Sequence, residues 1–177
     1  MKSMKKRQAH RIIMNKLKVY IDNRQKTVKI PSGLRLLVRR CCNATLVYEH
    51  FHGDAEVNVT FVNDAQIKEL NAQYRDKNVP TDVLSFPMGE DGKFDINPDT
   101  GAFVLGDVVI SLETAVVQAK KYDHSLQQEV AFLTVHSMLH IMGYDHVNGG
   151  IEAMHMHEHE AAVMKALGFT YDLYEEG

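Results

Sequence analysis

The chain has 177 residues, 45% of them hydrophobic and 24% charged, with a formal net charge of −3. This composition is that of a soluble globular protein. No apolar run approaches the roughly 20 residues of a membrane helix, so neither a span nor a membrane partner is expected. The two cysteines, Cys41 and Cys42, are adjacent and could pair only with strain. This excludes a disulfide framework and favours a cytoplasmic protein.

Hydrophobic periodicity predicts the elements in chain order. They are a strand (17–21), a helix (32–41), a strand (56–62), a helix (64–79), a strand (83–86), a mobile loop that could act as a lid (88–101), a strand (108–110) and three helices (112–122, 125–142 and 151–167). The expected N-caps are Ser32, Asn63 or Asp64, and Ser125. The order predicts an α+β fold in a single domain.

Basic residues are concentrated at the N-terminus. Seven lysine and arginine side chains and no acidic ones fall within residues 1–18. Such an arm can bind RNA phosphates, although most chain termini are simply solvated. We expect residues 1–16 to form a flexible arm and residues 17–177 to form the domain. Met14, just before the first strand, is an alternative start of the natural chain.

Three histidines form the most informative pattern, since His136, His140 and His146 are separated by four and six positions. Residues four apart share one face of a helix, so the first two can bind one ion. Gly143 can end the helix in a left-handed conformation and return the chain with the third. Three protein ligands leave a position for water, which is typical of catalytic zinc. The spacing predicts one Zn²⁺ per chain, although nickel, cobalt and copper also suit three imidazoles.

The same spacing, glycine included, occurs in the metzincin metalloproteases. In those enzymes a glutamate follows the first histidine and acts as general base. Here Ser137 holds that position, and its hydroxyl is too weakly basic to take a proton near neutral pH. A metalloprotease stays an alternative, but the residues favour a substrate other than peptide.

Residues 74–87 combine cations, a proline turn and a short strand. Arg75 carries a permanent charge on a planar group that can bind phosphate through two hydrogen bonds. Lys77 could add a second positive charge. The same cations would also suit the end of a surface helix, where they interact favourably with the helix dipole.

Together these segments resemble the YbeY family of bacterial endoribonucleases. The resemblance rests on H-x-x-L-H-x-x-G-Y-D-H at 136–146, Y-R-x-K-x-x-P-T-D-V-L-S-F-P at 74–87 and L-G-D-V-V-I-S at 105–111, and it extends from about Val19 to Leu167. The chain departs from the family pattern at Ser137, where glycine is usual, and at Asn78, where aspartate is typical.

The resemblance implies a small mixed sheet packed on helices, with the histidine-bearing helix at the centre. It also implies a zinc-dependent endoribonuclease specific for single-stranded RNA, which acts in 16S rRNA 3′-end maturation and ribosome quality control. Its partners would be the 16S rRNA precursor and the ribosome or its small subunit.

Site residues follow from the same resemblance. It makes His136, His140 and His146 zinc ligands and Arg75 the residue that binds the scissile phosphate. We count Arg75 and His136 as catalytic, with Lys77 as a further phosphate contact. A non-catalytic RNA- or ribosome-binding protein with a structural metal is the remaining alternative.

Other polar residues have weaker signals. His155 and His159 are four apart on the last helix and could bind a second metal, but we expect a solvated, partly titrating face there. Asp82 and Asp107 could orient the ligand histidines, or could simply begin or end strands.

Overall fold

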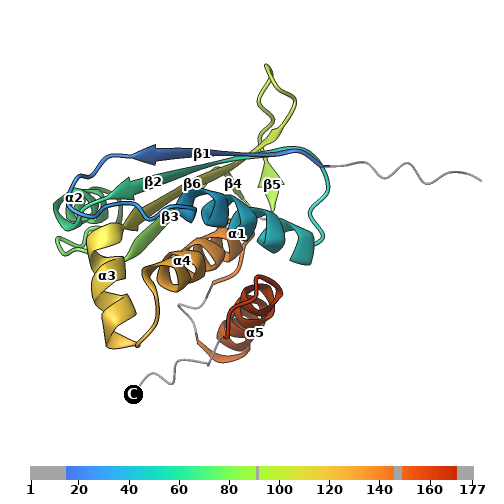
Figure 1. Cartoon of the computed structure of the whole chain (residues 1–177). Coiled ribbons are helices and arrows are strands. Elements are labelled where there is room, and N and C mark those ends of the chain that lie inside the picture. Colours follow the sequence, from blue (N-terminus) through green and yellow to red (C-terminus); the bar gives the residue numbers. More distant parts are fainter. Residues whose placement is uncertain (1–14, 91, 146–148, 171–177) are drawn as a thin grey trace, which may run out of the picture.

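The computed structural model describes residues 15–90, 92–145 and 149–170, and it shows a mixed sheet with helices layered beneath it (Figure 1). The sheet has the order β1-β2-β6-β3, with strands at Leu17–Asn23, Ala55–Val62, Phe103–Ser111 and Val83–Pro87. The first three strands are parallel, and β3 pairs antiparallel with β6 at one edge. Parallel neighbours need a crossover, which α1 (Leu34–Tyr48) provides between β1 and β2.

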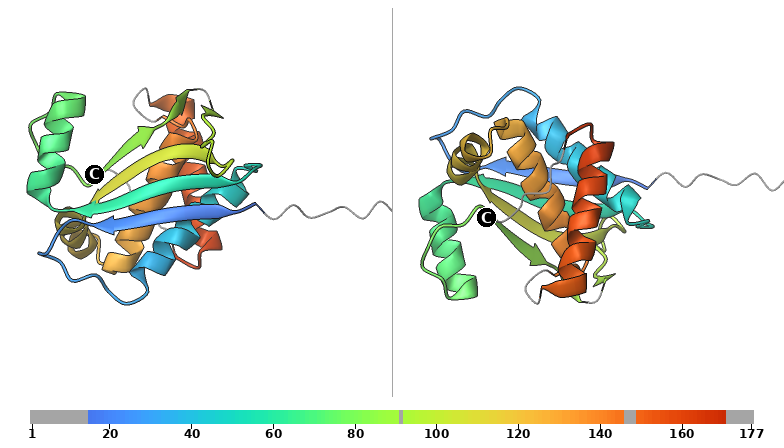
Figure 2. Two further views of the ribbon diagram at one scale, coloured as in Figure 1. Left: turned by 90° about the horizontal axis from the view of Figure 1, so that it is seen from above. Right: turned by 90° about the horizontal axis from the view of Figure 1, so that it is seen from below.

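α4 (Leu126–Ile141) lies at the centre of the helical layers, preceded in the chain by α3 (Leu112–Lys121). One side of α4 packs beneath the sheet and another packs on α5 (Gly150–Ala166), the outermost layer (Figures 1 and 2). The residues in these contacts are Val130, Leu133 and Met138 toward the sheet, and Ala131, Val135 and Leu139 toward α5. A helix that is apolar on several sides is expected to be buried. The predicted α+β fold, in one domain with a central histidine-bearing helix, is confirmed.

The other face of the sheet is covered at one end by α2 (Asp64–Arg75), as the left view of Figure 2 shows. A small apolar cluster of Val62, Ile67, Leu84 and Val109 holds this helix against the sheet. Asn63 caps α2 in a capping box with Gln66, which confirms one of the two expected caps. The C-terminal end of α2 therefore lies close to β3.

Two helix boundaries were predicted wrongly. Ser32 is not the N-cap of α1, because Gly33 takes that position in a left-handed conformation (φ 83°) and no side chain caps the helix. α2 does not continue to Val79. It ends at Arg75 because Asp76 adopts a left-handed conformation (φ 55°).

The predicted loop at residues 88–101 contains regular structure, so that prediction was also wrong. β4 (Gly89–Glu90) and β5 (Lys93–Phe94) form a short antiparallel pair. Thr100 then donates a hydrogen bond of 2.6 Å to Glu56 of β2. The turn-forming composition of this segment concealed both features, and the second depends on a partner 44 residues away.

Within the described residues, no helix is both long and apolar enough to cross a membrane. The predicted basic arm falls almost wholly on residues 1–14, which lie outside the described residues.

Candidate active site

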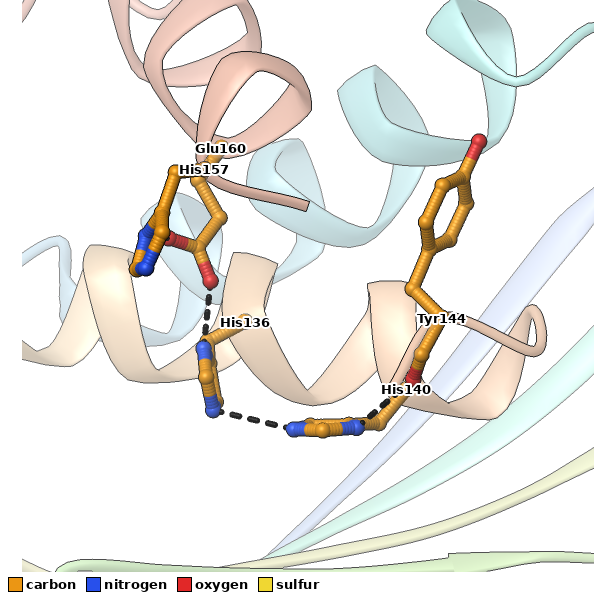
Figure 3. Close-up of polar contacts among 5 residues, drawn as sticks. All are labelled: His136, His140, Tyr144, His157 and Glu160. Carbon is orange, nitrogen blue, oxygen red and sulfur yellow. Dashed lines mark hydrogen bonds and ion pairs between the residues drawn. The ribbon is translucent and has the colours of Figure 1, made fainter. Parts of the chain in front are cut away.

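His136 and His140 lie one turn apart on α4, as their spacing predicts (Figure 3). Their Nε2 atoms are 3.1 Å apart and their ring centroids 4.6 Å apart. α4 ends at Ile141, and Gly143 (φ 107°) then turns the chain as expected. His146 lies outside the described residues, so its role as a ligand stays a prediction.

Each of the two imidazoles has an acceptor at its other nitrogen. Nδ1 of His136 bonds to the carboxylate of Glu160, and Nδ1 of His140 donates to the backbone oxygen of Tyr144 at 2.8 Å (Figure 3). A carboxylate and a carbonyl can only accept, so the proton of each neutral ring lies on Nδ1. Both Nε2 atoms then carry lone pairs that face each other, an arrangement that only a shared proton or a cation makes favourable. The donor set therefore fits a metal ion, since metal-binding histidines usually donate their other N–H in this way.

Glu160 is the site residue that sequence reasoning missed. It is fully buried and also contacts His157 Nδ1 at 3.2 Å. Burial would raise the pKa of Glu160, but its contacts with His136 and His157 outweigh burial and hold the pKa below its usual value. Glu160 is thus a charged acceptor for His136.

A sequence signal for Glu160 did exist. Met156, Glu160, Val163 and Met164 follow the spacing of one helix face, and all four are buried. The solvated face predicted for this segment is correct for His155, which is exposed, and wrong for Glu160.

A second set of contacts holds the turn that follows α4. Tyr144 donates from its hydroxyl to Glu49, the C-cap residue of α1, at 2.8 Å, and Nδ1 of His159 bonds to the same carboxylate at 2.5 Å. Burial and the hydrogen bond to Glu49 raise the pKa of Tyr144 to about 12. α1 and α5 thereby fix the residue whose carbonyl orients His140. His159 serves in this contact, which does not support a second metal site with His155.

The two histidines open onto a cavity of about 770 Å³ between α4, β3 and the end of α2. Arg75, the last residue of α2, lines the same cavity. Lys77 is exposed and is not among the lining residues. The fold thus brings Arg75, His136 and His140 to one cleft, although they are up to 65 positions apart in the sequence.

The two aspartates proposed as possible orienting residues accept hydrogen bonds from other groups. Asp82 lines the cleft, where it accepts from the backbone N–H of Val83 at 2.8 Å. Asp107 lies on the open face of the sheet, where Asn58 donates to it at 2.8 Å. Asp82 directly precedes β3, as the structural alternative expects, whereas Asp107 lies within β6 rather than at either end of it. The acceptors for the histidines are Glu160 and the backbone oxygen of Tyr144.

Ser137 is fully buried in α4 and does not line the cleft. Within the described part of the chain its hydroxyl has no hydrogen-bond partner. The residue at the position of the metalloprotease base is therefore unsuited to that role both chemically and by location.

Comparisons with known proteins are consistent with this geometry. The family model described as Endoribonuclease YbeY matches residues 20–168. A protein named Endoribonuclease YbeY from Alkaliphilus metalliredigens is 45% identical over 150 residues, covering 85% of this chain and 95% of that protein. One of the same name from Caldanaerobacter subterraneus subsp. tengcongensis is 46% identical over 157 residues, covering 86% and 98%. A solution structure from Thermotoga maritima matches the fold with a TM-score of 0.53 at 23% identity, over 89% of this chain and 99% of that one.

Proposed function

Because the chain belongs to the YbeY family of endoribonucleases, we propose that it is a zinc-dependent enzyme that cuts single-stranded RNA in the cleft between α4 and β3. The main support for the proposal is that Arg75 lines the same cavity as His136 and His140, whose rings are oriented by hydrogen bonds at Nδ1. We further propose that it acts in the cytoplasm on the 16S rRNA precursor during 3′-end maturation and ribosome quality control, in contact with the ribosome or its small subunit.

His136, His140 and His146 would hold the metal, one ion per chain. The first two are supported by their Nδ1 acceptors and facing Nε2 atoms, and the third by its spacing in the sequence. When bound, zinc supplies positive charge beside the phosphate and activates water at neutral pH.

Arg75 would bind the scissile phosphate. Its guanidinium can make two parallel hydrogen bonds to phosphate oxygens and stabilise the negative charge that develops there. Its place in the lining of the cavity that also holds His136 and His140 supports this role. Lys77, farther along the chain and outside the cavity lining, would at most contact a neighbouring phosphate.

RNA cleavage also requires a nucleophile, and two are available. Water would cut RNA and DNA alike, whereas attack by the neighbouring 2′-hydroxyl would cut RNA alone and leave a 2′,3′-cyclic phosphate. The cleft has room for either route, and the product ends decide between them.

The proposal is tested by incubating the purified chain with a labelled single-stranded RNA, its DNA counterpart, the corresponding RNA duplex and casein. The His140→Ala variant, purified in the same way, controls for contaminating nucleases. We expect cleavage of the single-stranded RNA by the wild type alone. Casein cleavage would favour a metalloprotease, and RNA binding with full metal content but no cleavage would favour a binding protein.

A further inference from the structure

A second cavity, of about 920 Å³, lies on the open face of the sheet. One row of side chains crosses all four strands on its floor, because Tyr20 pairs with Asn58, Asn58 with Asp107, and Asp107 with Phe86. Tyr20 is 50% exposed. Asn58 donates to Asp107 at 2.8 Å, which leaves the amide oxygen and the second carboxylate oxygen as acceptors.

This cavity adjoins the catalytic cleft. Tyr74 and Phe86 line both of them, and their rings meet edge to face with centroids 5.2 Å apart. Phe86 belongs to β3, which is an edge strand of the sheet (Figure 2, left view). Tyr74 is 60% exposed at the crossing point. A strand leaving the cleft over β3 would therefore pass directly onto the open face.

We propose that the open face of the sheet is a second binding site for the RNA substrate, which takes the unpaired bases on one side of the scissile phosphate. The proposal rests on the proposed function, because an endonuclease must accommodate a polymer that continues beyond the bond it cuts. Single-stranded RNA is typically bound by stacking of bases on aromatic side chains and by hydrogen bonds to base edges. Tyr74 and Tyr20 supply the stacking surfaces, and the Asn58–Asp107 pair between them accepts from base amino groups.

The charges on this face favour bases over a phosphate backbone. Asp107 lies on the floor, and Arg24 is neutralised by Asp22 at 2.7 Å. A duplex would present its phosphates to this acidic floor, whereas a single strand can turn its bases inward. Its phosphates can then lie at the rim, where Arg39 is exposed. The site thus selects single-stranded RNA.

The test compares KM for two single-stranded RNAs with the same cleavage site, one that fills only the cleft and one extended on both sides. For Tyr20→Ala we expect the ratio of the long-substrate KM to the short-substrate KM to rise about tenfold, as the loss of one stacked base predicts. Tyr20→Phe, which keeps the ring, should restore the wild-type ratio. Val117→Ala, on an exposed position of α3, is the matched control.

An unchanged ratio in Tyr20→Ala would overturn the proposal while leaving the proposed function intact, and it would indicate another occupant such as a protein segment. If the wild type cuts neither RNA, the proposed function fails. The binding site would then be judged by fluorescence anisotropy of the long RNA. Weaker binding by Tyr20→Ala, but not by Tyr20→Phe or Val117→Ala, would support it, and equal binding by all would overturn it.

Discussion

Glu160 on α5 accepts a hydrogen bond from Nδ1 of His136 on α4, although the two residues are 24 positions apart. The carboxylate is fully buried, and the histidine is the one that begins the predicted metal motif. A buried charge requires a partner, so α5 has a specific role in the site beyond covering the core. It fixes the ring orientation that presents Nε2 to the cleft.

Replacing Glu160 by glutamine should weaken metal binding. Glutamine keeps the size of the side chain but removes the charge, and loss of such an acceptor typically lowers metal affinity about 10–100-fold. The measurement is competition for zinc with a chromophoric chelator. His157→Gln is the matched control, because it removes the other contact of Glu160 and leaves His136 in place. Equal zinc affinities in the wild type and Glu160→Gln would refute the orienting role.

The Arg75→Ala and Lys77→Ala variants should differ sharply in their rates of RNA cleavage. Arg75 lines the cleft, so Arg75→Ala should nearly abolish RNA cleavage while zinc content and melting temperature stay near wild type. Lys77→Ala should alter cleavage only slightly, because this residue is exposed and outside the lining. Arg75→Lys should recover little activity, since a lysine cannot form two parallel bonds to phosphate. Zinc loss in Arg75→Ala would instead indicate a structural role.

Ser137→Ala should stabilise the protein. The buried hydroxyl has no partner among the described residues, and an unpaired buried polar group costs about 1–3 kcal/mol. Alanine also has the higher helix propensity. We expect the free energy of unfolding in urea to rise by about 1 kcal/mol, with RNA cleavage and zinc content unchanged. A lower free energy of unfolding in Ser137→Ala than in the wild type would show that the hydroxyl has a partner.

Cys41 and Cys42 should be unreactive in the folded protein. Both are fully buried, and burial raises the pKa of Cys41 to about 12 and that of Cys42 further still. A raised pKa favours the thiol in the folded state. The stabilisation of the folded state that results is complete at pH values below 9, the pKa of a thiol in the unfolded chain. It is lost as the pH rises toward 12. Iodoacetamide at pH 8 should label neither residue until urea unfolds the chain, and rapid labelling of the native protein would contradict this burial.

The sequence was sufficient for features set by local periodicity. A spacing of four on an apolar helix placed His136 and His140 together. Alternation located β1 and β2, and apolar runs located β3 and the end of β6, whereas the β4–β5 pair was missed. The role of Glu160 depends on how α5 packs on α4, so it required the tertiary structure, although its place on an apolar stripe was a usable signal. The start of α1 was missed because a left-handed glycine replaces a capping side chain.

Other features could not be predicted from the sequence because they depend on strand order and register. Tyr20 and Phe86 lie in one row only because β1, β2, β6 and β3 pair as they do, and the sequence does not fix that order. The nearness of Arg75 to the histidines likewise depends on where α2 ends relative to β3. The family resemblance implied its role, and the fold places it in the lining of the same cavity as the two histidines.

The most direct test of the account is elemental analysis of the purified wild type beside His140→Ala, both reconstituted with zinc and desalted. We predict about one zinc per chain in the wild type and a large loss in the variant, with both proteins folded by circular dichroism. No bound metal in the reconstituted wild type, or equal metal in the two proteins, would contradict the assignment of these histidines as a metal centre.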